Sequence, residues 1–507
     1  MLENEDNKTE EVENFINKIR PALWRENEMT GKVDRAQMLL TSDVISDSGN
    51  ELLCRILETG EADPNAADNY SKNFLRFKQL YLEKSQSSPN QIFHFINALL
   101  NYTILLPIDA DDQETALTIF NTLNNRGLPL SDADIFKSHL YKGLDEAGKR
   151  DFIKKWKDLE AATEKIDESI QSLFYYHMFY LRAIENDINT SIPGVRKYYL
   201  DKNKNRLTVD VMDKLAENLH LWEVIKGREE MIDEPWSKNM DIRKMLDILS
   251  SYTNEFWKYP VSIFYMQYKH KEDFESLFLK FLRKFVVLLI TRFLEHPSVS
   301  AIKGEVLKLN AQLITKDHPI FYAGFDEVRV TDEHEEQAEK TRTDYLIIAP
   351  QKRIERMLLK LLAYMSEDQK ELLPALWEIE HIFPQTWDTK YYNYDKEKIA
   401  ESLEHIGNKL PLEKKLNISA SNNYFDKKKE KYRASQIAIS AKIGNSSLIE
   451  WNLDNIADED IKIAAQVKQL FKTWVTDYES APIQKEKSQP TPEEQAQIER
   501  FRKLGYI

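Results

Sequence analysis

The stretch from Trp377 to Ser435 decides how the C-terminal part of this chain folds. It begins WEIEHIFPQTW (377–387), passes through a charged spacer and ends HIGNKLPLEKKLNISASNNYFDKKKEKYRAS (405–435). Trp377, Ile379 and His381 alternate with glutamates, and this period of two predicts a strand that Pro384 ends.

Two further elements complete this region. A second short strand is predicted at Lys409–Leu412. From Asn422 onward, Phe425, Lys429 and Tyr432 recur at spacings of three and four, which predicts a helix. The sequence therefore predicts a strand, strand, helix finger with an acid/His pair at the end of its first strand.

Four separated motifs follow one another within about sixty residues. They are Glu380-His381-Ile382-x-Pro384, then Gly407-Asn408, then Asn417, and then Asn422, Phe425, Lys428 and Tyr432. Together they resemble the HNH, or His-metal finger, nuclease domain at the C-terminus of GmrSD-type modification-dependent restriction enzymes. Hydrolysis of a phosphodiester requires a base for water and a cation for the phosphorane and the departing 3′ oxygen, and an acid/His pair can supply both.

The resemblance implies a role for each polar residue of the finger. His381 would be the general base and Glu380 a metal ligand. Asn417 or Asn422 would be a second ligand through its amide oxygen, and Asn408 would fix the loop that bears the histidine. Oxygen ligands with an open coordination sphere favour Mg²⁺ or Mn²⁺ over zinc.

Other interpretations of these residues stay open. Neighbours on a regular strand point to opposite faces, so Glu380 and His381 share a site only if the strand breaks there, as Pro384 suggests. Asn417 and Asn422 could instead be a turn residue and a helix cap. A second acid/His pair, Glu404-His405, is interpreted as packing ahead of the Gly407-Asn408 turn.

Basic residues are concentrated in this part of an acidic chain. The formal charge of the whole chain is −14, whereas Lys409–Arg433 contains eight Lys or Arg against three acids. We therefore expect any nucleic acid to bind here, although such a run of charges can also form a face that is simply exposed to solvent. The candidate DNA contacts are Lys414, Lys415, Lys427, Lys428, Lys429, Lys431 and Arg433.

Composition sets the fold class. The 507 residues include 30% charged and 42% hydrophobic residues and only 13 glycines, which predicts a soluble, mainly α protein. One cysteine excludes disulfides within the chain, and no apolar run is long enough to cross a membrane. With an acidic N-terminus in place of a signal peptide, we expect a cytoplasmic protein.

A second resemblance lies nearer the N-terminus, in ALTIFNTLNNRGLPLSDADIFKSHLY (116–141). It is similar to the latter half of the ParB-like N-terminal domain of the same family. The family's Pro-x-Tyr-Gln-Arg and Asp-Gly-Gln-Gln-Arg elements, which handle nucleotides, do not occur, so we expect no hydrolysis of GTP or ATP. The loop GLDEAGK (143–149) has the spacing of a phosphate-binding loop, but its acids would repel phosphate and it follows a helix.

These observations predict four regions. Residues 1–145 form a truncated, remnant α/β region without the nucleotide-handling elements, 146–366 a helical body, 367–480 the ββα-metal (HNH) finger domain, and 481–507 a linker and terminal helix. The predicted function is a metal-dependent endonuclease acting in defence on double-stranded DNA, modified or unmodified. The alternative is a non-catalytic subunit whose partner carries the nucleotide site.

Overall fold

The protein is described from a computed structural model. It describes residues 9–27, 29–39, 47–66, 68–87, 89–104, 131–201, 203–295, 298, 302–315, 347–387, 394 and 396–476. The chain divides into two compact units, residues 1–126 and 127–507, which are considered separately.

The first unit contains four helices and a hairpin among its described residues. They are α1 (Glu10–Leu23), β1 (Trp24–Glu26), β2 (Val33–Met38), α2 (Asp47–Thr59), α3 (Asn69–Ser87) and α4 (Pro89–Asn101). The sequence of residues 1–101 predicts helices joined by short loops, and the antiparallel β1–β2 hairpin was not predicted. The run YTILLPI (102–108), rich in β-branched and apolar residues, predicts a strand. Residues 105–108 lie outside the described part of the chain, and Tyr102 to Ile104 are not in a strand.

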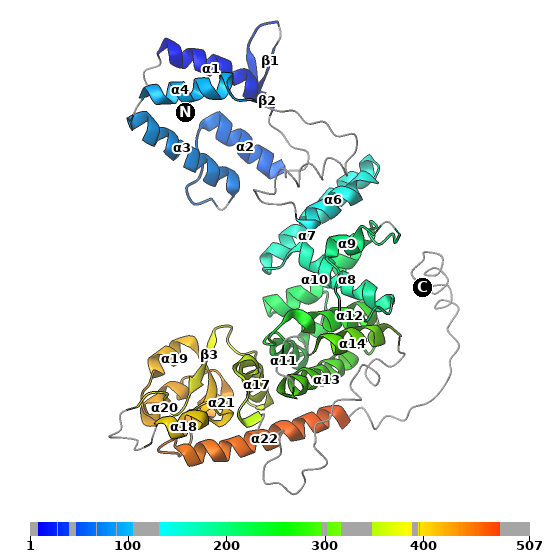
Figure 1. Cartoon of the computed structure of the whole chain (residues 1–507), viewed down its shortest axis with the longest axis vertical. Helices are drawn as coiled ribbons and strands as arrows, with labels where there is room; N and C mark the ends of the chain where they lie inside the picture. Colours follow the sequence, from blue (N-terminus) through cyan, green and yellow to red (C-terminus); the bar gives the residue numbers. More distant parts are fainter. Residues whose placement is uncertain are drawn as a thin grey trace, which may run out of the picture. The chain divides into compact units, whose positions relative to one another are not determined.

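The second unit begins with a helical body (Figure 1). Its helices are α6 (Asp132–Lys142), α7 (Glu146–Lys165), α8 (Ile170–Ile184), α9 (Val195–Tyr199), α10 (Val211–Gly227), η3 (Pro235–Lys238), α11 (Met240–Leu249), η4 (Glu255–Trp257), α12 (Lys258–Tyr268), α13 (Phe274–Glu295), α14 (Lys303–Thr315) and α17 (Lys352–Met365). The mainly α prediction is confirmed. Among the described helices, none is long and apolar enough to cross a membrane.

Helix α6 packs on the helical body. Ser131 caps it in a reciprocal capping box with Asp134. Its Phe136 is fully buried against Phe174 and Tyr199. The boundary between the units therefore falls at Arg126, ahead of the predicted position at 145.

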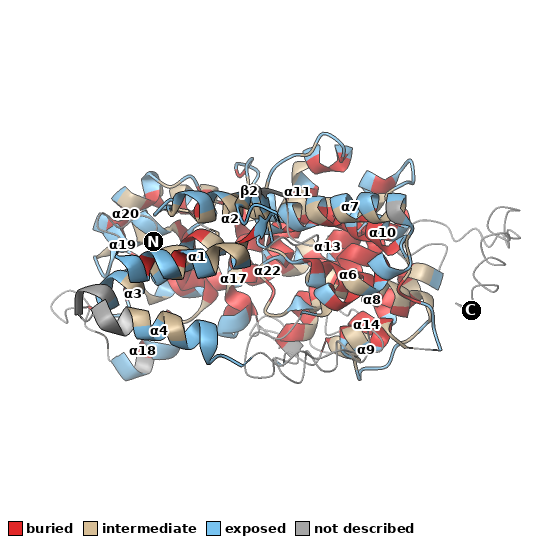
Figure 2. Ribbon diagram, turned by 90° about the horizontal axis from the view of Figure 1, so that it is seen from above, coloured by how far each residue is buried: buried red, intermediate tan, exposed pale blue. Residues whose placement is uncertain are grey.

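The core of the body is rich in aromatic side chains. The run Phe174–Tyr180 lacks the interleaved basic residues of a base-stacking surface, which favours a place in the core. Its Phe174, Met178 and Phe179 are completely buried. Figure 2 shows buried residues gathered on α8 and α13.

The C-terminal finger follows α17. It consists of β3 (Trp377–His381), α18 (Lys396–Leu403), η6 (Ile406–Asn408), β4 (Lys409–Glu413), α19 (Lys414–Ala420), α20 (Phe425–Arg433), α21 (Ala438–Gly444) and α22 (Leu453–Thr476). Both predicted strands and the helix from Phe425 are present, and α19 between them is an addition. The start of α22 packs on η6 and its body on α13, so this long helix joins the finger to the helical body (Figure 1).

Candidate active site

The two strands of the finger form a regular antiparallel ladder. His381 lies directly opposite Lys409, and Glu380 lies opposite Leu410. Paired residues project to the same face and consecutive residues to opposite faces. The expected break in the strand at Glu380 is therefore absent, and the Glu380 and His381 side chains lie on different faces of the sheet.

His381 stands on the face turned toward α17. Its Nε2 lies 3.6 Å from Glu404 Oε1 and 3.3 Å from the amide nitrogen of Gln385. Burial lowers the pKa of the imidazole to about 4, and the positive charge of Lys409 lowers it further than the negative charge of Glu404 raises it. At neutral pH the ring is therefore uncharged and able to accept a proton.

Glu380 lies on the opposite face, under α20. Its Oε1 is 2.8 Å from Lys428 Nζ and accepts a 2.7 Å hydrogen bond from Tyr432. The same ammonium donates to the backbone carbonyl of His381 at 2.5 Å. Because Lys428 and Tyr432 are one helical turn apart, α20 presents both donors to one carboxylate.

Burial acts on both members of this ion pair. It raises the pKa of Glu380 against the opposing effect of Lys428, and it lowers the pKa of Lys428. The Lys428 side chain is only 1% exposed and that of Glu380 6%. The two groups therefore depend on each other for their charged forms.

The metal site that the resemblance implies was tested against these contacts. The Glu380 carboxylate is already neutralised by Lys428, which occupies the position beside it where a cation would bind. Within the described part of the chain, no three His, Cys, Asp or Glu side chains gather closely enough to hold a metal ion. In this arrangement the donor set does not fit Mg²⁺ or Mn²⁺, because the ion would have to displace the ammonium.

Asn408 links the two strands just beyond His381. Its side chain accepts a 2.7 Å hydrogen bond from the Phe383 backbone amide and donates to the carbonyls of Phe383 and Leu403. Its own carbonyl accepts from the amide of Ile382. These bonds fix the backbone of Ile382 and Phe383, the two residues after His381. Asn408 itself is completely buried.

The two residues of the acid/His pair Glu404-His405 have different partners. His405 Nδ1 lies 2.7 Å from Asp460 of α22, whose other oxygen accepts from the Gly407 amide at 2.8 Å. The packing interpretation fits His405 in this way, but it is wrong for Glu404, which faces His381. Asp460 is buried at this point and fixes the turn of η6.

The two candidate asparagines are not joined to the strand residues. Asn417 is half-buried in α19, and Asn422 is exposed ahead of α20. The hydrogen bonds found among the described residues do not connect either amide side chain with Glu380 or His381. Asn422 is also not the cap of α20, whose N-terminal flanking residue is Tyr424.

The seven basic candidates separate into two groups. Lys428 and Lys429 are buried, and the Lys429 ammonium donates to the carbonyls of Ser446 and Leu448 at 2.6 and 2.7 Å. Both lysines are therefore wrong as DNA contacts, because their ammonium groups are used inside the finger. Lys431 is half-buried, and the exposed Arg433 donates to the carbonyl of Gly444.

The remaining three basic candidates are exposed. We call them the exposed lysines: Lys414, Lys415 and Lys427.

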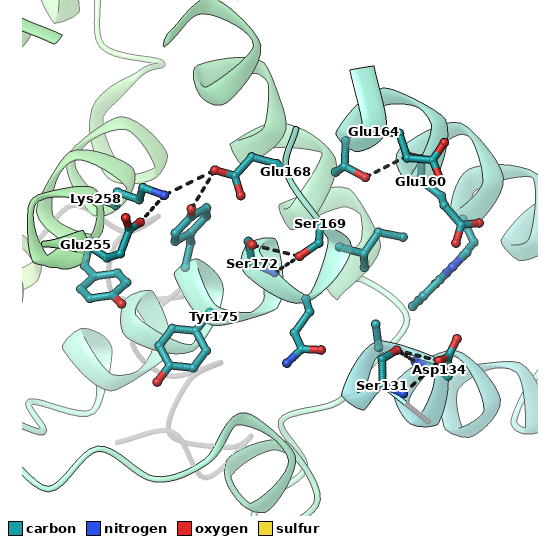
Figure 3. A pocket seen from close by; sticks show the side chains of 17 residues that line it. Ser131, Asp134, Glu160, Glu164, Glu168, Ser169, Ser172, Tyr175, Glu255 and Lys258 are labelled. Atoms are coloured by element: carbon teal, nitrogen blue, oxygen red, sulfur yellow. Dashed lines mark hydrogen bonds and ion pairs between the residues drawn. The ribbon is translucent and has the colours of Figure 1, made fainter. Parts of the chain in front are cut away.

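A hollow in the helical body is unsuited to phosphate. This cavity of about 510 Å³ is lined by five carboxylates and by aromatic side chains that include Tyr175. Its one lysine, Lys258, is paired with Glu168 and Glu255 (Figure 3). Because the remaining acids would repel an anion, the cavity is not a nucleotide or DNA site. The five acids are Asp134, Glu160, Glu164, Glu168 and Glu255.

The loop that imitates a phosphate-binding loop is also structural. Asp145 caps α7, with its side chain accepting from the Gly148 amide at 2.8 Å. The loop follows α6 and not a strand, as its sequence indicated.

The sequence analysis did not identify two residues whose side chains lie near His381, Glu404 and Lys409. Lys409 would have been found from the register of the two strands, which places it opposite His381. Glu404 stands three residues before Gly407 in the second motif, but no local pattern indicates which way its side chain turns.

Known families account for both ends of the chain. A sequence model of the GmrSD restriction endonuclease C-terminal domain matches residues 331–466, a range that includes α17 and most of the finger. A model of the GmrSD N-terminal domain matches residues 12–141, from α1 through most of α6. The search of curated proteins found no match. Because the N-terminal and C-terminal domains both occur here, in the order of the family, the chain belongs to the GmrSD-type restriction endonucleases.

Proposed function

We propose that the finger is an HNH-type nuclease centre in which His381 is the general base for hydrolysis of a DNA phosphodiester. The observation that supports this most directly is the position of the imidazole, which lies at the end of β3, partly exposed beside Glu404, while Asn408 holds the residues that follow it. Burial lowers its pKa, which favours the neutral ring at neutral pH. A neutral imidazole is the form that accepts a proton from water.

The step can be written with the chain's own groups. The imidazole takes a proton from water, the resulting oxygen bonds to phosphorus, and the bond from phosphorus to the 3′ oxygen breaks, with a solvent proton going to the leaving oxygen. A bound phosphate brings negative charge toward His381 and so raises the pKa of the imidazole from its low value. DNA binding therefore makes His381 a stronger base where it is needed.

Double-stranded DNA would approach along the exposed lysines, with Lys431 and Arg433 beside them. Each phosphate that they neutralise releases counterions, which gives a binding term independent of sequence. Whether the DNA must be modified is a further proposal that comes from the family alone.

The cofactor Mg²⁺ or Mn²⁺ stays a prediction of the resemblance. When bound, a divalent ion would stabilise the phosphorane and the departing oxygen. The present contacts of Glu380 do not fit it, so the step above uses none. Cleavage assays with each ion and with EDTA test this prediction.

The experiment that tests the function is plasmid cleavage by the purified chain and its His381→Ala variant, with DNA both unmodified and glucosylated. Removal of a general base lowers the rate about 10²- to 10⁴-fold. The control is His270→Ala, which removes an imidazole that is 80% exposed in the body. Equal cleavage by the wild type and His381→Ala would refute the assignment of the base.

One observation favours a second candidate, a non-catalytic subunit of a restriction complex. The ammonium of Lys428 lies 2.8 Å from Glu380, at the position that a metal ion would have to take, and so favours a finger that holds no metal there. A protein partner would then carry the nucleotide site. A wild-type chain that binds DNA but cuts no substrate with either ion would support this candidate.

A further inference from the structure

We infer that Glu404 is the positioning residue for His381, and that Glu355 on α17 holds Glu404 in place through Lys409. The catalytic centre would then be built jointly by the finger and by a helix that lies before it in the chain. This inference rests on the proposed role of His381 as the base.

The contacts form a continuous chain. Lys409 Nζ lies 2.7 Å from Glu355 Oε1 and 3.0 Å from Glu404 Oε2. The other oxygen of Glu404 lies 3.6 Å from His381 Nε2. Gln385 spans the same gap, because its amide nitrogen is 3.2 Å from Glu404 Oε1 and 3.3 Å from His381 Nε2.

Burial restricts the Lys409 side chain, which lies at the middle of these contacts. The Lys409 side chain is fully buried, and that of Glu355 is 7% exposed. A buried ammonium must keep its carboxylate partners, since losing them would leave an unpaired charge away from water. Because Lys409 also stands opposite His381 in the ladder, the two side chains project to the same face of the sheet.

Glu404 differs from its two partners because its side chain remains 41% exposed. An unrestrained glutamate at this exposure would sample several rotamers. The bond to Lys409 removes that freedom from one oxygen and leaves the other oxygen facing His381. Glu404 is therefore held ready beside the imidazole before DNA arrives, which is how precise placement raises a rate.

The chemistry gives Glu404 a defined task. The Gln385 amide has two N–H groups, enough to donate to both Glu404 Oε1 and His381 Nε2. Nε2 is then the unprotonated nitrogen, and the proton of the neutral ring lies on Nδ1. For water to donate to Nε2, the Gln385 amide must give up its bond to that nitrogen. Once Nε2 accepts a proton from water, the Glu404 carboxylate, whose Oε1 lies 3.6 Å from Nε2, stabilises the imidazolium.

Helix α17 is fixed to the body by a second buried lysine. Lys360 lies 3.0 Å from Asp247 Oδ1 and donates to the Asp247 carbonyl at 2.8 Å. Arg356 of the same helix donates to the carbonyl of Trp377 at the start of β3 at 2.8 Å. The helix that supplies Glu355 therefore contacts both the body and the catalytic strand.

The test compares four variants of the full chain in single-turnover cleavage and in DNA binding. Glu404→Gln should lower the cleavage rate about 10- to 100-fold, the usual effect of removing a residue that orients a functional histidine, with unchanged DNA affinity. Glu404→Asp should recover part of that loss, and Glu355→Gln should show a smaller loss. The matched control is Glu413→Gln, a half-buried carboxylate on β4 that bonds to Ser435 and the Gln436 amide instead.

A spectroscopic readout separates positioning from stability. In protein labelled with ¹⁵N-histidine, Glu404→Gln should shift the ring nitrogens of His381 and leave those of His405 in place. Glu413→Gln should shift neither ring, whatever its effect on unfolding. Unchanged His381 resonances in Glu404→Gln would overturn the inference even if that variant cut slowly.

The two levels of the proposal fail in different ways. If His381→Ala is inactive and Glu404→Gln cuts like the wild type, the inference is wrong and the base assignment stands. If His381→Ala cuts like the wild type, the base assignment itself is wrong.

Discussion

Replacing Lys428 by methionine gives the sharpest test of the buried ion pair. Methionine keeps an apolar chain of similar length but removes the ammonium from Glu380. In the structure the lysine side chain is 1% exposed and the carboxylate 6%, so water cannot replace the ammonium beside Glu380. Removing one partner of such a pair lowers the free energy of unfolding by about 3 to 5 kcal/mol.

Two features place the expected loss near the lower end, at about 3 kcal/mol. Tyr432 continues to donate to Glu380, and burial already raises the pKa of this carboxyl, so it can take up a proton in the variant. In the double variant Glu380→Gln/Lys428→Met both charges are gone and the tyrosine bond remains. We expect it to be more stable than Lys428→Met alone by about 1 to 3 kcal/mol.

The assay is unfolding in urea, followed by far-UV circular dichroism and tryptophan fluorescence. Lys427→Met is the matched control, because Lys427 is the exposed neighbour on the same helix and its replacement should change stability by less than about 0.5 kcal/mol. If Lys428→Met is as stable as Lys427→Met, the Lys428 ammonium lies in solvent, and Lys428 is again a candidate DNA contact.

Three further predictions concern other parts of the molecule. Gly407→Ala should destabilise the chain in urea by about 1 to 3 kcal/mol, because the added Cβ would lie 2.7 Å from Asp460 Oδ1 and 2.6 Å from a backbone carbonyl of α22. Burial lowers the pKa of His177 to about 4, so the unfolded chain binds the proton first and stability falls from about pH 6.5 toward pH 4, by at most about 1.4 kcal/mol per pH unit from this group. His177→Gln should flatten the dependence of unfolding on pH in that window, and an unchanged slope would assign it to other groups. Changing the exposed lysines to Gln should reduce the slope of log K for DNA against log salt by about 0.9 for each phosphate that is no longer neutralised, measured in the His381→Ala background.

The arrangement at Glu380 bears on how metal dependence should be interpreted. An ion that binds there must displace an ammonium that also holds the His381 carbonyl. Metal binding would then change the end of β3 as well as the charge beside it. Comparing histidine resonances with and without Mg²⁺ would show whether such a change occurs.

Local patterns were sufficient for the elements of the finger and for the class of the fold. The alternation from Trp377 to His381 and the three- and four-residue spacing after Phe425 are periods of single strands and helices, and both elements are present. The capping of α6 by Ser131 is also a local feature, because it joins Ser131 to Asp134 three positions on. The β1–β2 hairpin was not predicted, because its strands are short and mostly polar and show no clear alternation.

The placement of the polar side chains required the tertiary structure. A regular pairing of β3 with β4 put Glu380 and His381 on opposite faces, and pairing is a contact between distant segments. The lysine run 427–429 looks uniform in sequence, but the helical period turns Lys428 and Lys429 inward while Lys427 stays exposed. Glu404 shows the same limit: its neighbours in sequence indicate a turn, and only the packing of β4 and α17 brings Lys409 and Glu355 together to direct it toward His381. The sequence by itself determined the fold class, the two strands and the helix α20 of the finger, and where the basic residues gather, because those properties are local. Which charges are buried, paired or free to act was decided by contacts across the fold.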